Sequence, residues 1–341
     1  MHLLVLGGTV FLSRAVAAEA VARGHRVTCA ARGISGSVPD GAALVRVDRD
    51  EPAGLDPLAG TAFDAVVDVE SMSPTRVRRA LAVLGARAGH WTYVSTCSVY
   101  ADHETPGQRA DSAPLLDPAP DGADETDGEL YGRLKLAAEN AVRETLGERA
   151  FICRPGLIVG RGDRSDRFGY WPARVSAGGR FLAPGSPENQ VQYVDVRDCA
   201  AWIVTAAEQR LVATLDAVCP PVRWGEWLAR LTAAVGSGAE PVWVPQEFLL
   251  EHGVAPWMGP GSLPLWLPVP EYAGFMTCDV GASLAAGLHI RPLEDTVAES
   301  LGWERELGLD RERRTGITRE RESELLAAWA QRGTAGGTAA G

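Results

Sequence analysis

The chain has 341 residues, enough for one large α/β domain or two coupled domains. Hydrophobic residues make up 46% of it and charged residues 23%, proportions that are typical of soluble globular proteins. The formal net charge of -11 argues against nucleic acid as the main partner, because a phosphate backbone requires clustered lysine and arginine.

The sequence shows no membrane anchor or targeting segment, so we expect a cytoplasmic protein. The apolar run Leu3–Leu6 follows Met1-His2 without a cationic leader, and no run of about 20 apolar residues could cross a bilayer. The cysteines form no Cys-x-x-Cys pair and no Cys/His cluster, which predicts buried free thiols and no metal site. They are Cys29, Cys97, Cys153, Cys199, Cys219 and Cys278.

The first half of the chain alternates short apolar runs with stretches of helical periodicity. The apolar runs predict strands over residues 3–6, 25–31, 43–47, 63–69 and 90–96. Apolar residues recur at helical spacing from Phe11 to Val21, ahead of Gly24, and a second helix is expected over 74–84. Strands that alternate with helices pair in parallel through right-handed crossovers, so we predict an α/β fold with a doubly wound Rossmann sheet.

Residues 101–130 interrupt this rhythm. They hold nine carboxylates, one arginine and four prolines, which predicts a long loop that is either functional or disordered. We expect this loop to close over the substrate. After it we predict a helix over 130–146, a strand over 148–160, and a strand followed by a helix over 191–207.

The composition changes after about residue 220, where tryptophans and prolines become frequent. We therefore predict an NADP-binding Rossmann domain from residues 1–160 and 190–220, and a smaller C-terminal substrate-binding region from residues 161–189 and 221–331. Residues 332–341 are expected to form a disordered tail, because they offer nothing to pack.

A candidate phosphate-binding turn follows the first predicted strand. Gly7 and Gly8 stand between a strand and a helix, the context that a dinucleotide site requires. Val10 and Ser13 occupy positions where the spacing Gly-x-x-Gly-x-x-Gly has glycines, so a purely structural turn is the alternative. The predicted cofactor contacts here are Gly7, Gly8, Thr9, Val10, Phe11 and Leu12.

The end of the second predicted strand indicates which dinucleotide is bound. An NAD site places a carboxylate there, about 20 residues past the turn, to accept from the ribose 2′-hydroxyl. This chain has Arg32 instead, which suits a 2′-phosphate and favours NADP(H) over NAD(H); a solvated arginine is the alternative. Asp48, at the end of the third strand, is placed to meet the adenine edge.

The strongest catalytic signal is Tyr131-Gly-Arg-Leu-Lys135, which places a phenol and an ammonium on one helix face. A nearby cation favours phenolate and lowers the pKa of the tyrosine, which makes it a proton donor. The pattern also occurs by chance in many helices. Here, however, it follows the strand end Ser95–Tyr100, whose hydroxyls could hold a substrate carbonyl.

Five segments resemble, in their order and spacing, the extended short-chain dehydrogenase/reductase superfamily and its NAD(P)-dependent epimerase/dehydratase group. They are VLGGTVFLSR, YVSTCSVYA, YGRLK, RPGLIVGRGD and VQYVDVRD. The resemblance covers residues 1 to about 220 well and the remainder loosely, and it implies a Rossmann domain with a Ser/Thr–Tyr–Lys triad.

The resemblance implies roles for the matching residues. The catalytic hydroxyl falls on Thr96, with Ser98 as the alternative; Tyr131 would be the acid/base, and Lys135 would bind the nicotinamide ribose and lower the pKa of Tyr131. Cys97 and Tyr100, in the same strand-end segment, are candidate substrate contacts. The other implied cofactor contacts are Val69, Arg154, Pro155 and Gly156. The family also implies a homodimer through the helix that carries Tyr-x-x-x-Lys.

Three departures from the family pattern favour a cofactor site and argue against dehydratase and epimerase activity. The turn resembles a Gly-Gly-Thr-x-Phe subgroup, which favours a cofactor site. Thr96-Cys97-Ser98 replaces the acid pair of sugar-nucleotide dehydratases, and Val191 stands where related epimerases have an arginine that grips the diphosphate.

Basic residues concentrate between residues 161 and 174. Arg161, Arg164, Arg167 and Arg174 are interleaved with aspartates and aromatic residues. They could bind an anion, but a solvated and self-paired face is the more usual arrangement. Arg167, Tyr170 and Trp171 are the candidate substrate contacts in this segment.

Together these patterns predict an NADP(H)-dependent oxidoreductase that reduces a ketone or aldehyde, or oxidises an alcohol, on a small, partly apolar or cyclic metabolite. The first alternative is a nucleotide-sugar epimerase with tightly bound NAD. The second is a non-catalytic dinucleotide-binding or RNA-binding protein, because the Gly-Gly-Thr-x-Phe subgroup includes RNA-binding relatives; the net charge of -11 argues against RNA.

Overall fold

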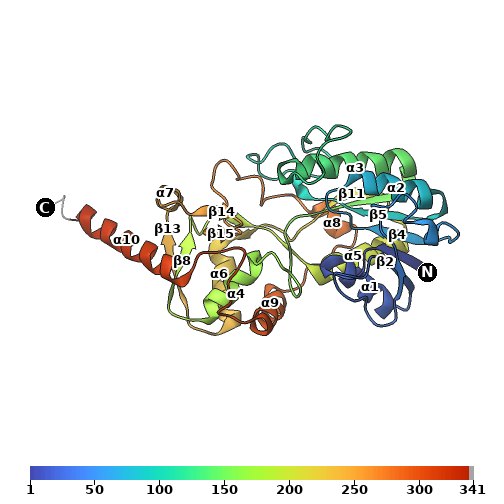
Figure 1. The fold of residues 1–341 in the computed structure, drawn as a ribbon. Coiled ribbons are helices and arrows are strands. Elements are labelled where there is room, and N and C mark those ends of the chain that lie inside the picture. The colour runs from blue at the N-terminus through green and yellow to red at the C-terminus, as the bar shows by residue number, and fades with distance from the viewer. Residues whose placement is uncertain (338–341) are drawn as a thin grey trace.

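The computed structural model describes residues 1–337 and contains a sheet of seven strands with helices on both faces (Figure 1). The strands of the sheet are β1 (His2–Leu6), β2 (Arg26–Ala31), β3 (Ala43–Arg46), β4 (Ala65–Asp68), β5 (Trp91–Val94), β6 (Ala150–Pro155) and β11 (Ala213–Ala217). Their order is β3-β2-β1-β4-β5-β6-β11, and all neighbours are parallel. The predicted α/β fold with a doubly wound Rossmann sheet is confirmed.

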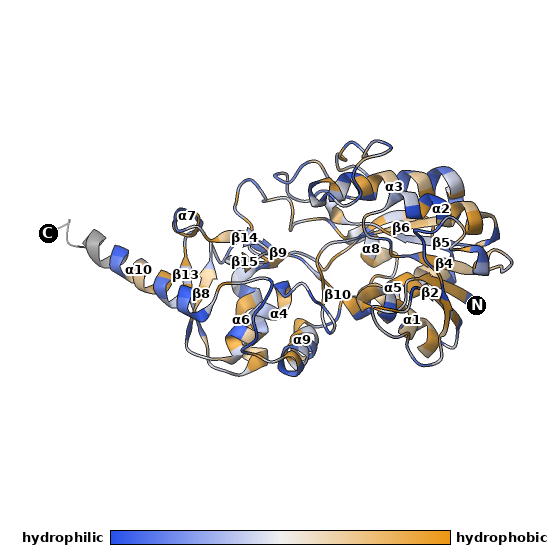
Figure 2. Ribbon diagram, in the orientation of Figure 1, coloured by the Kyte–Doolittle hydropathy of each residue, from blue (hydrophilic) through white to orange (hydrophobic). Residues whose placement is uncertain are grey.

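Two pairs of helices cover the sheet. The helices α1 (Phe11–Ala22) and α5 (Val196–Gln209) pack side by side on one face, and α2 (Pro74–Leu84) and α3 (Tyr131–Leu146) on the other (Figure 1). Because both faces are covered, the strands are apolar without alternation, and Leu3, Leu4 and Val5 are all fully buried. The hydrophobic colour of the central strands in Figure 2 follows from this double cover.

The predicted elements agree closely with the observed ones. The helix predicted over 74–84 is α2, which begins after Ser73 because that side chain accepts a hydrogen bond from the Arg76 amide at 3.0 Å. The single strand predicted over 148–160 is instead divided into β6 and β7 (Ile158–Val159), since the chain turns at Pro155-Gly156.

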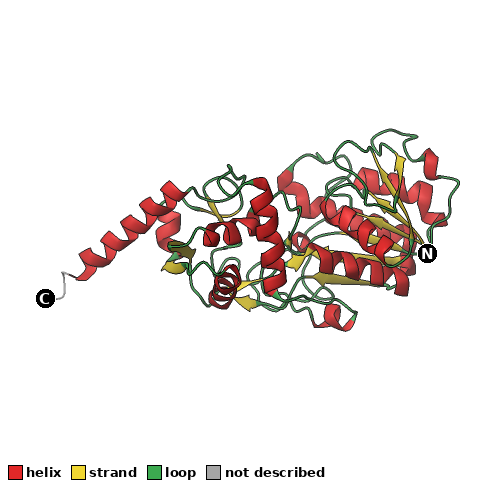
Figure 3. Ribbon diagram, turned by 90° about the horizontal axis from the view of Figure 1, so that it is seen from below, coloured by secondary structure: helices red, strands yellow, loops and turns green. Residues whose placement is uncertain are grey.

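Apart from α8 and the short 3-10 turns, the remaining elements form the C-terminal region and its connections to the sheet, and Figure 3 shows that helices dominate it. The strand pairs are β7 with β10 (Val194–Asp195), β9 (Gln190–Val191) with β12 (Val222–Arg223), β8 (Arg180–Pro184) with β13 (Glu240–Val244), and β14 (Ala255–Trp257) with β15 (Ser262–Pro264). The helices are α4 (Arg167–Ser176), α6 (Trp224–Val235), α7 (Gln246–Glu251), α8 (Gly281–Ala285), α9 (Leu293–Leu307) and α10 (Arg319–Gly337). Short 3-10 turns are η1 (Asp56–Leu58), η2 (Gly85–Arg87), η3 (Cys97–Val99), η4 (Gly128–Leu130) and η5 (Gly147–Arg149).

A separate aromatic core holds the C-terminal region together. Trp224 and Trp227 stack with ring centroids 4.9 Å apart, and Trp171 meets Trp224 edge-on at 5.2 Å. All three side chains are buried in one cluster that is distinct from the two cores flanking the sheet. This second core explains why the composition changes after about residue 220.

The structure places two segments differently from the predicted division. Residues 281–288 pack on the Rossmann core, because Trp202 donates its indole N–H to the Ala286 carbonyl at 2.9 Å and Leu288 is buried beside it. Residues 332–337 belong to α10, where the sequence predicted a disordered tail, and Arg332 pairs with Glu251 at 3.0 Å. The rest of that predicted tail, residues 338–341, lies outside the described residues.

Within residues 1–337, none of the helices combines the length and the apolar character that a membrane-spanning segment requires.

Candidate active site

A cleft of about 650 Å³ opens at the carboxyl ends of the parallel strands, where ligands bind in doubly wound sheets. It runs from the ends of β2 and β3, past the turn after β1, to the start of α3. The predicted site residues that line it are Gly7, Thr9, Val10, Phe11, Leu12, Arg32, Asp48, Val69, Thr96, Tyr131, Lys135, Pro155, Gly156 and Arg167.

The glycine turn after β1 has no room for side chains. Gly7 and Gly8 have φ values of +127° and +94°, and a Cβ on Gly8 would lie 2.4 Å from Sγ of Cys29. Val10 is accommodated because it precedes α1 in an extended conformation with φ -139°. The Ser13 hydroxyl donates to the Val10 carbonyl at 2.7 Å, so in this structure it closes the helix start instead of pointing to a ligand. The backbone cradle fits a pyrophosphate.

Charged groups gather at the end of the cleft formed by β2 and β3. Arg32 is exposed, and no hydrogen bond or ion pair of residues 1–337 involves its guanidinium. Asp48 lines the same end and accepts a hydrogen bond from the Asp50 amide at 3.0 Å. The sequence reasoning missed Arg49, which also lines the cleft and is paired with the buried Asp68 at 2.8 Å. Arg32 is therefore the available cation for a ribose phosphate at this end.

Tyr131 begins α3 at the opposite end of the cleft, beside Thr96. Burial raises the pKa of the Tyr131 phenol, while the Thr96 hydroxyl and the positive charge of Arg167 act to lower it. Thr96 lies just past the end of β5, where its hydroxyl accepts from the Ser98 amide at 3.1 Å. Ser98 itself does not line the cleft, so the geometry favours Thr96 over the alternative hydroxyl.

Lys135 lies one helical turn after Tyr131 and is buried. Its ammonium donates to the Glu70 and Val94 carbonyls at 2.6 and 2.5 Å, and it lies 4.5 Å from the centroid of the Tyr93 ring. Burial lowers the pKa of Lys135 to about 8, while the carboxylates of Asp68, Glu70 and Glu139 act in the opposite direction. The predicted effect of Lys135 on the pKa of Tyr131 stays a prediction.

Arg154 lies behind the cleft wall, although the family resemblance implied a contact with nicotinamide and substrate. Its guanidinium forms two hydrogen bonds with Glu139, at 2.9 and 2.8 Å, and both side chains are buried. Its neighbours Pro155 and Gly156 do line the cleft. The Arg154–Glu139 pair ties β6 to α3 and so supports the helix that carries Tyr131.

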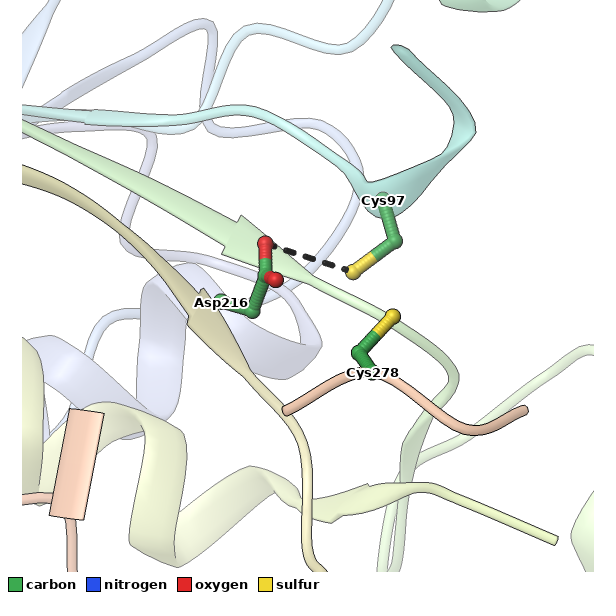
Figure 4. Close-up of side chains that lie close together, drawn as sticks. All are labelled: Cys97, Asp216 and Cys278. Carbon is green, nitrogen blue, oxygen red and sulfur yellow. Dashed lines mark hydrogen bonds between the residues drawn. The ribbon is translucent and has the colours of Figure 1, made fainter. Parts of the chain in front are cut away.

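Cys97 and Tyr100 also point away from the cleft, contrary to the predicted substrate contacts. Figure 4 shows the thiols of Cys97 and Cys278 close together beside Asp216, and the Cys97 thiol lies 3.9 Å from the carboxylate. Tyr100 donates its hydroxyl to the same carboxylate. A hydrogen bond with Cys278, together with burial, raises the pKa of the Cys97 thiol, and burial raises the pKa of Asp216 to about 6. We read this cluster as an anchor that joins residues 274–281 to the end of β5.

The basic segment 161–174 divides into paired and unpaired arginines. Arg161 pairs with Glu306, and Arg174 pairs with the buried Glu322 at 2.6 Å. Both partners lie outside the segment and Arg174 is itself buried, so these two arginines do not form the expected solvated and self-paired face. Arg164 is exposed and lies outside the cleft, whereas Arg167 lines it. Tyr170 and Trp171 do not reach the cleft, because both are buried in the aromatic core of the C-terminal region.

The acidic loop 101–130 does not cover the cleft, and none of its residues lines it. Ala119 packs on Leu134 and Ala137 of α3, and Asp121 pairs with Arg78 of α2 at 3.1 Å. Residues 119–125 of the loop thus lie in the groove between α2 and α3, where Ala119 is buried. Residues 103–108 lie instead against residues 272–279. The predicted homodimer through α3 stays a prediction, and it would have to accommodate this loop.

The class of protein follows from this arrangement. A parallel sheet in this order, a side-chain-free turn after β1, and a tyrosine and lysine one helical turn apart at the cleft define an NAD(P)-dependent protein of the short-chain dehydrogenase/reductase type. The family model of the NAD-dependent epimerase/dehydratase family matches residues 3–214, and the chain belongs to that family. A comparison with curated proteins finds no match.

Solved structures agree with this fold. A candidate epimerase from Burkholderia cenocepacia J2315 superposes with a TM-score of 0.66 at 20% identity, covering 89% of this chain and 98% of its own. MoeE5 in complex with UDP-glucose and NAD gives 0.62 at 18% identity, covering 90% and 99%. The human epimerase family protein SDR39U1 (isoform 2) with NADPH gives 0.59 at 20% identity, covering 89% and 99%. At these identities the likeness shows the fold alone.

Proposed function

We propose that the chain is an NADP(H)-dependent oxidoreductase that interconverts a carbonyl and an alcohol on a small, partly apolar or cyclic metabolite. One observation carries the proposal: the Tyr131 phenol and the Thr96 hydroxyl line the same end of the cleft, with Lys135 one helical turn away. These groups fit proton transfer to a substrate oxygen. The acid pair that water elimination would need is replaced by Thr96-Cys97-Ser98.

Different residues of the cleft would bind the cofactor and transfer the proton. The backbone of Gly7 and Gly8 would hold the pyrophosphate, and the Lys135 ammonium would meet the nicotinamide ribose. When bound, the nicotinamide supplies hydride to the carbonyl carbon or takes it from the alcohol. Thr96 and Tyr131 donate hydrogen bonds to the carbonyl oxygen, and Tyr131 gives that oxygen its proton in the direction of reduction.

The preference for NADP(H) rests on Arg32. It directly follows β2, where an NAD site has a carboxylate, and its guanidinium forms no hydrogen bond or ion pair with residues 1–337, although its charge acts on the nearby Asp50. A 2′-phosphate would supply that partner as a charge-assisted hydrogen bond.

A nucleotide-sugar epimerase is the second candidate, because the family includes epimerases and one similar structure holds UDP-glucose and NAD. Against it, Val191 stands where related epimerases have a diphosphate-binding arginine, and it is fully buried in the aromatic core. A bound diphosphate would therefore lack the hydrogen bonds that this arginine donates in the related epimerases.

The test combines binding and turnover with purified full-length protein. We expect NADPH to bind more tightly than NADH, small cyclic ketones to be reduced with oxidation of NADPH, and UDP-glucose not to stabilise the protein against heat. Tyr131→Phe should lower turnover by about 10²- to 10⁴-fold and leave NADPH affinity within about twofold. Stabilisation by UDP-glucose with retained NAD would instead establish the epimerase.

A further inference from the structure

One cation at the catalytic end of the cleft has no ionic partner. Arg167 lines the cleft with Tyr131 and Thr96, yet no ion pair of residues 1–337 includes it. Its Nε donates to the Ser165 hydroxyl at 3.2 Å, and its guanidinium lies 5.2 Å from the centroid of the Trp257 ring. The two terminal nitrogens, which are the bidentate donors of an arginine, form no hydrogen bond within residues 1–337.

The groups that surround Arg167 do not neutralise it. The nearest carboxylate is Asp163, which accepts hydrogen bonds from the amide of Ser165 at 2.8 Å and from the hydroxyl of Ser165 at 3.0 Å. Ser165 therefore lies between the two charged groups. The charge of Asp163, which also lines the cleft, acts to raise the pKa of Arg167, but burial of the guanidinium has the larger effect and lowers it. The next carboxylate, Asp166, is already engaged by Arg311.

Local backbone structure makes this position still more positive. Arg167 is the first residue of α4, and the amino end of a helix repels a cation. The fold therefore holds a guanidinium at an unfavourable place without a direct ion pair to any of residues 1–337. The arginines on either side serve as a contrast, because Arg161 and Arg174 are both paired with glutamates.

We propose that Arg167 binds an anionic oxygen group of the substrate, a carboxylate or a phosphate, while the substrate carbonyl lies against Thr96 and Tyr131. The inference rests on the proposed oxidoreductase function and adds the substrate class: an oxo acid or a phosphorylated ketone, or the corresponding alcohol. A guanidinium recognises either anion in a bidentate manner, and the Trp257 ring covers its face.

The first experiment measures turnover with NADPH for matched charged and neutral ketones. The carboxylate pair is 4-oxocyclohexanecarboxylate and its methyl ester, and the phosphate pair is dihydroxyacetone phosphate and dihydroxyacetone. We expect kcat/KM to favour the charged member of one pair by roughly tenfold or more, and Arg167→Gln to remove that preference with a much smaller effect on the neutral member. Arg164→Gln, at an exposed arginine outside the cleft, is the matched control and should keep the preference.

The second experiment does not depend on turnover. Calorimetry with NADP+-loaded protein compares cyclohexanecarboxylate with cyclohexanecarboxamide, and phenyl phosphate with phenol. If the wild type binds one of the anions and Arg167→Gln does not, the inference is supported. If in addition no ketone is reduced, only the proposed function is contradicted. Reduction of ketones without any preference for charge, together with equal binding of charged and neutral probes by the wild type, overturns the inference and leaves the function standing.

Discussion

The guanidinium of Arg167 and the phenol of Tyr131 face the same cleft, and the charge of Arg167 lowers the pKa of Tyr131 against the effect of burial. Arg167 thereby has two consequences. It offers a positive site for the substrate, and it favours the ionised form of the group that exchanges the proton. The two effects can be separated by choosing a substrate without charge.

The first prediction concerns the pH dependence of Arg167→Gln with the neutral substrate dihydroxyacetone. Reduction needs the protonated phenol, so the rate falls as pH rises through the pKa of Tyr131. Loss of the Arg167 charge removes an influence that lowers this pKa, so the alkaline decline should move to higher pH. The pH profile of kcat measures it, with Arg164→Gln as the control. A shift to lower pH would contradict the electrostatic relationship.

The second prediction separates the two candidate hydroxyls. Thr96 lines the cleft and Ser98 does not, although the Thr96 hydroxyl also donates to Ser98 Oγ at 3.2 Å. We expect Thr96→Ala to lower kcat by about 10²-fold, and Ser98→Ala to lower it by less than about fivefold. Steady-state kinetics with a saturating cyclic ketone checks this. An equal decrease of kcat in the two variants would mean that Thr96 only stabilises the turn at residues 96–98 and does not contact the substrate.

The third prediction concerns cofactor choice. Arg32→Gln should weaken NADPH binding by about 10- to 100-fold and change NADH binding little, because only NADPH offers the 2′-phosphate. Arg26→Gln is a suitable control, since Arg26 is an exposed arginine at the other end of β2. Calorimetric titration of both variants with both cofactors gives the answer, and an equal loss for NADH and NADPH would remove Arg32 from the phosphate site.

The fourth prediction tests the turn after β1. Gly8→Ala would place a Cβ 2.4 Å from Sγ of Cys29 at a φ of +94°, so overlap and backbone strain add. We expect a loss of about 2–4 kcal/mol in the free energy of unfolding, with weaker NADPH binding. Gly24→Ala is the matched control, because Gly24 has φ +81° but no atom within 4 Å of the new Cβ.

The Gly24→Ala control measures the cost of placing an alanine at a positive φ when the new Cβ meets no other atom. Gly24→Ala should cost about 1 kcal/mol and leave NADPH binding unchanged. Urea denaturation of the two variants and the wild type measures the difference. If Gly8→Ala costs no more than Gly24→Ala, the contact with Cys29 is not tight.

Much of the fold and part of the site could be predicted from local pattern. The apolar runs predicted six strands of the central sheet, and for the inner strands the reason is that strands buried on both faces must be apolar without alternation. The edge strand β3 was predicted as well, although it is largely exposed. Tyr131 and Lys135 could be placed on one face of a helix because their spacing is one helical turn. The strand-end position of Thr96 followed in the same way, since parallel strands bring their carboxyl ends to one edge.

The errors share a different origin. Arg154 and Cys97 are adjacent in sequence to cleft residues and Tyr100 follows shortly after them, but none of the three side chains lines the cleft. Their partners are distant in sequence: Glu139 for Arg154, and Asp216 for Cys97 and Tyr100. A side chain that is close to the cleft in sequence can bind such a distant partner and then point away from the cleft. A single sequence does not show which distant residues come within reach.

The sequence by itself therefore determined most elements of the sheet domain up to about residue 207, the glycine turn, and the pair Tyr131–Lys135, because each depends on residues within one element or one turn. Only the tertiary structure decided that Arg167 forms no direct ion pair with residues 1–337 while Arg161 and Arg174 are paired with glutamates. The reason is that an ion pair depends on which carboxylates the packing of α9 and α10 brings within reach. Those helices supply Glu306 and Glu322, which lie 145 and 148 residues after Arg161 and Arg174 in the chain.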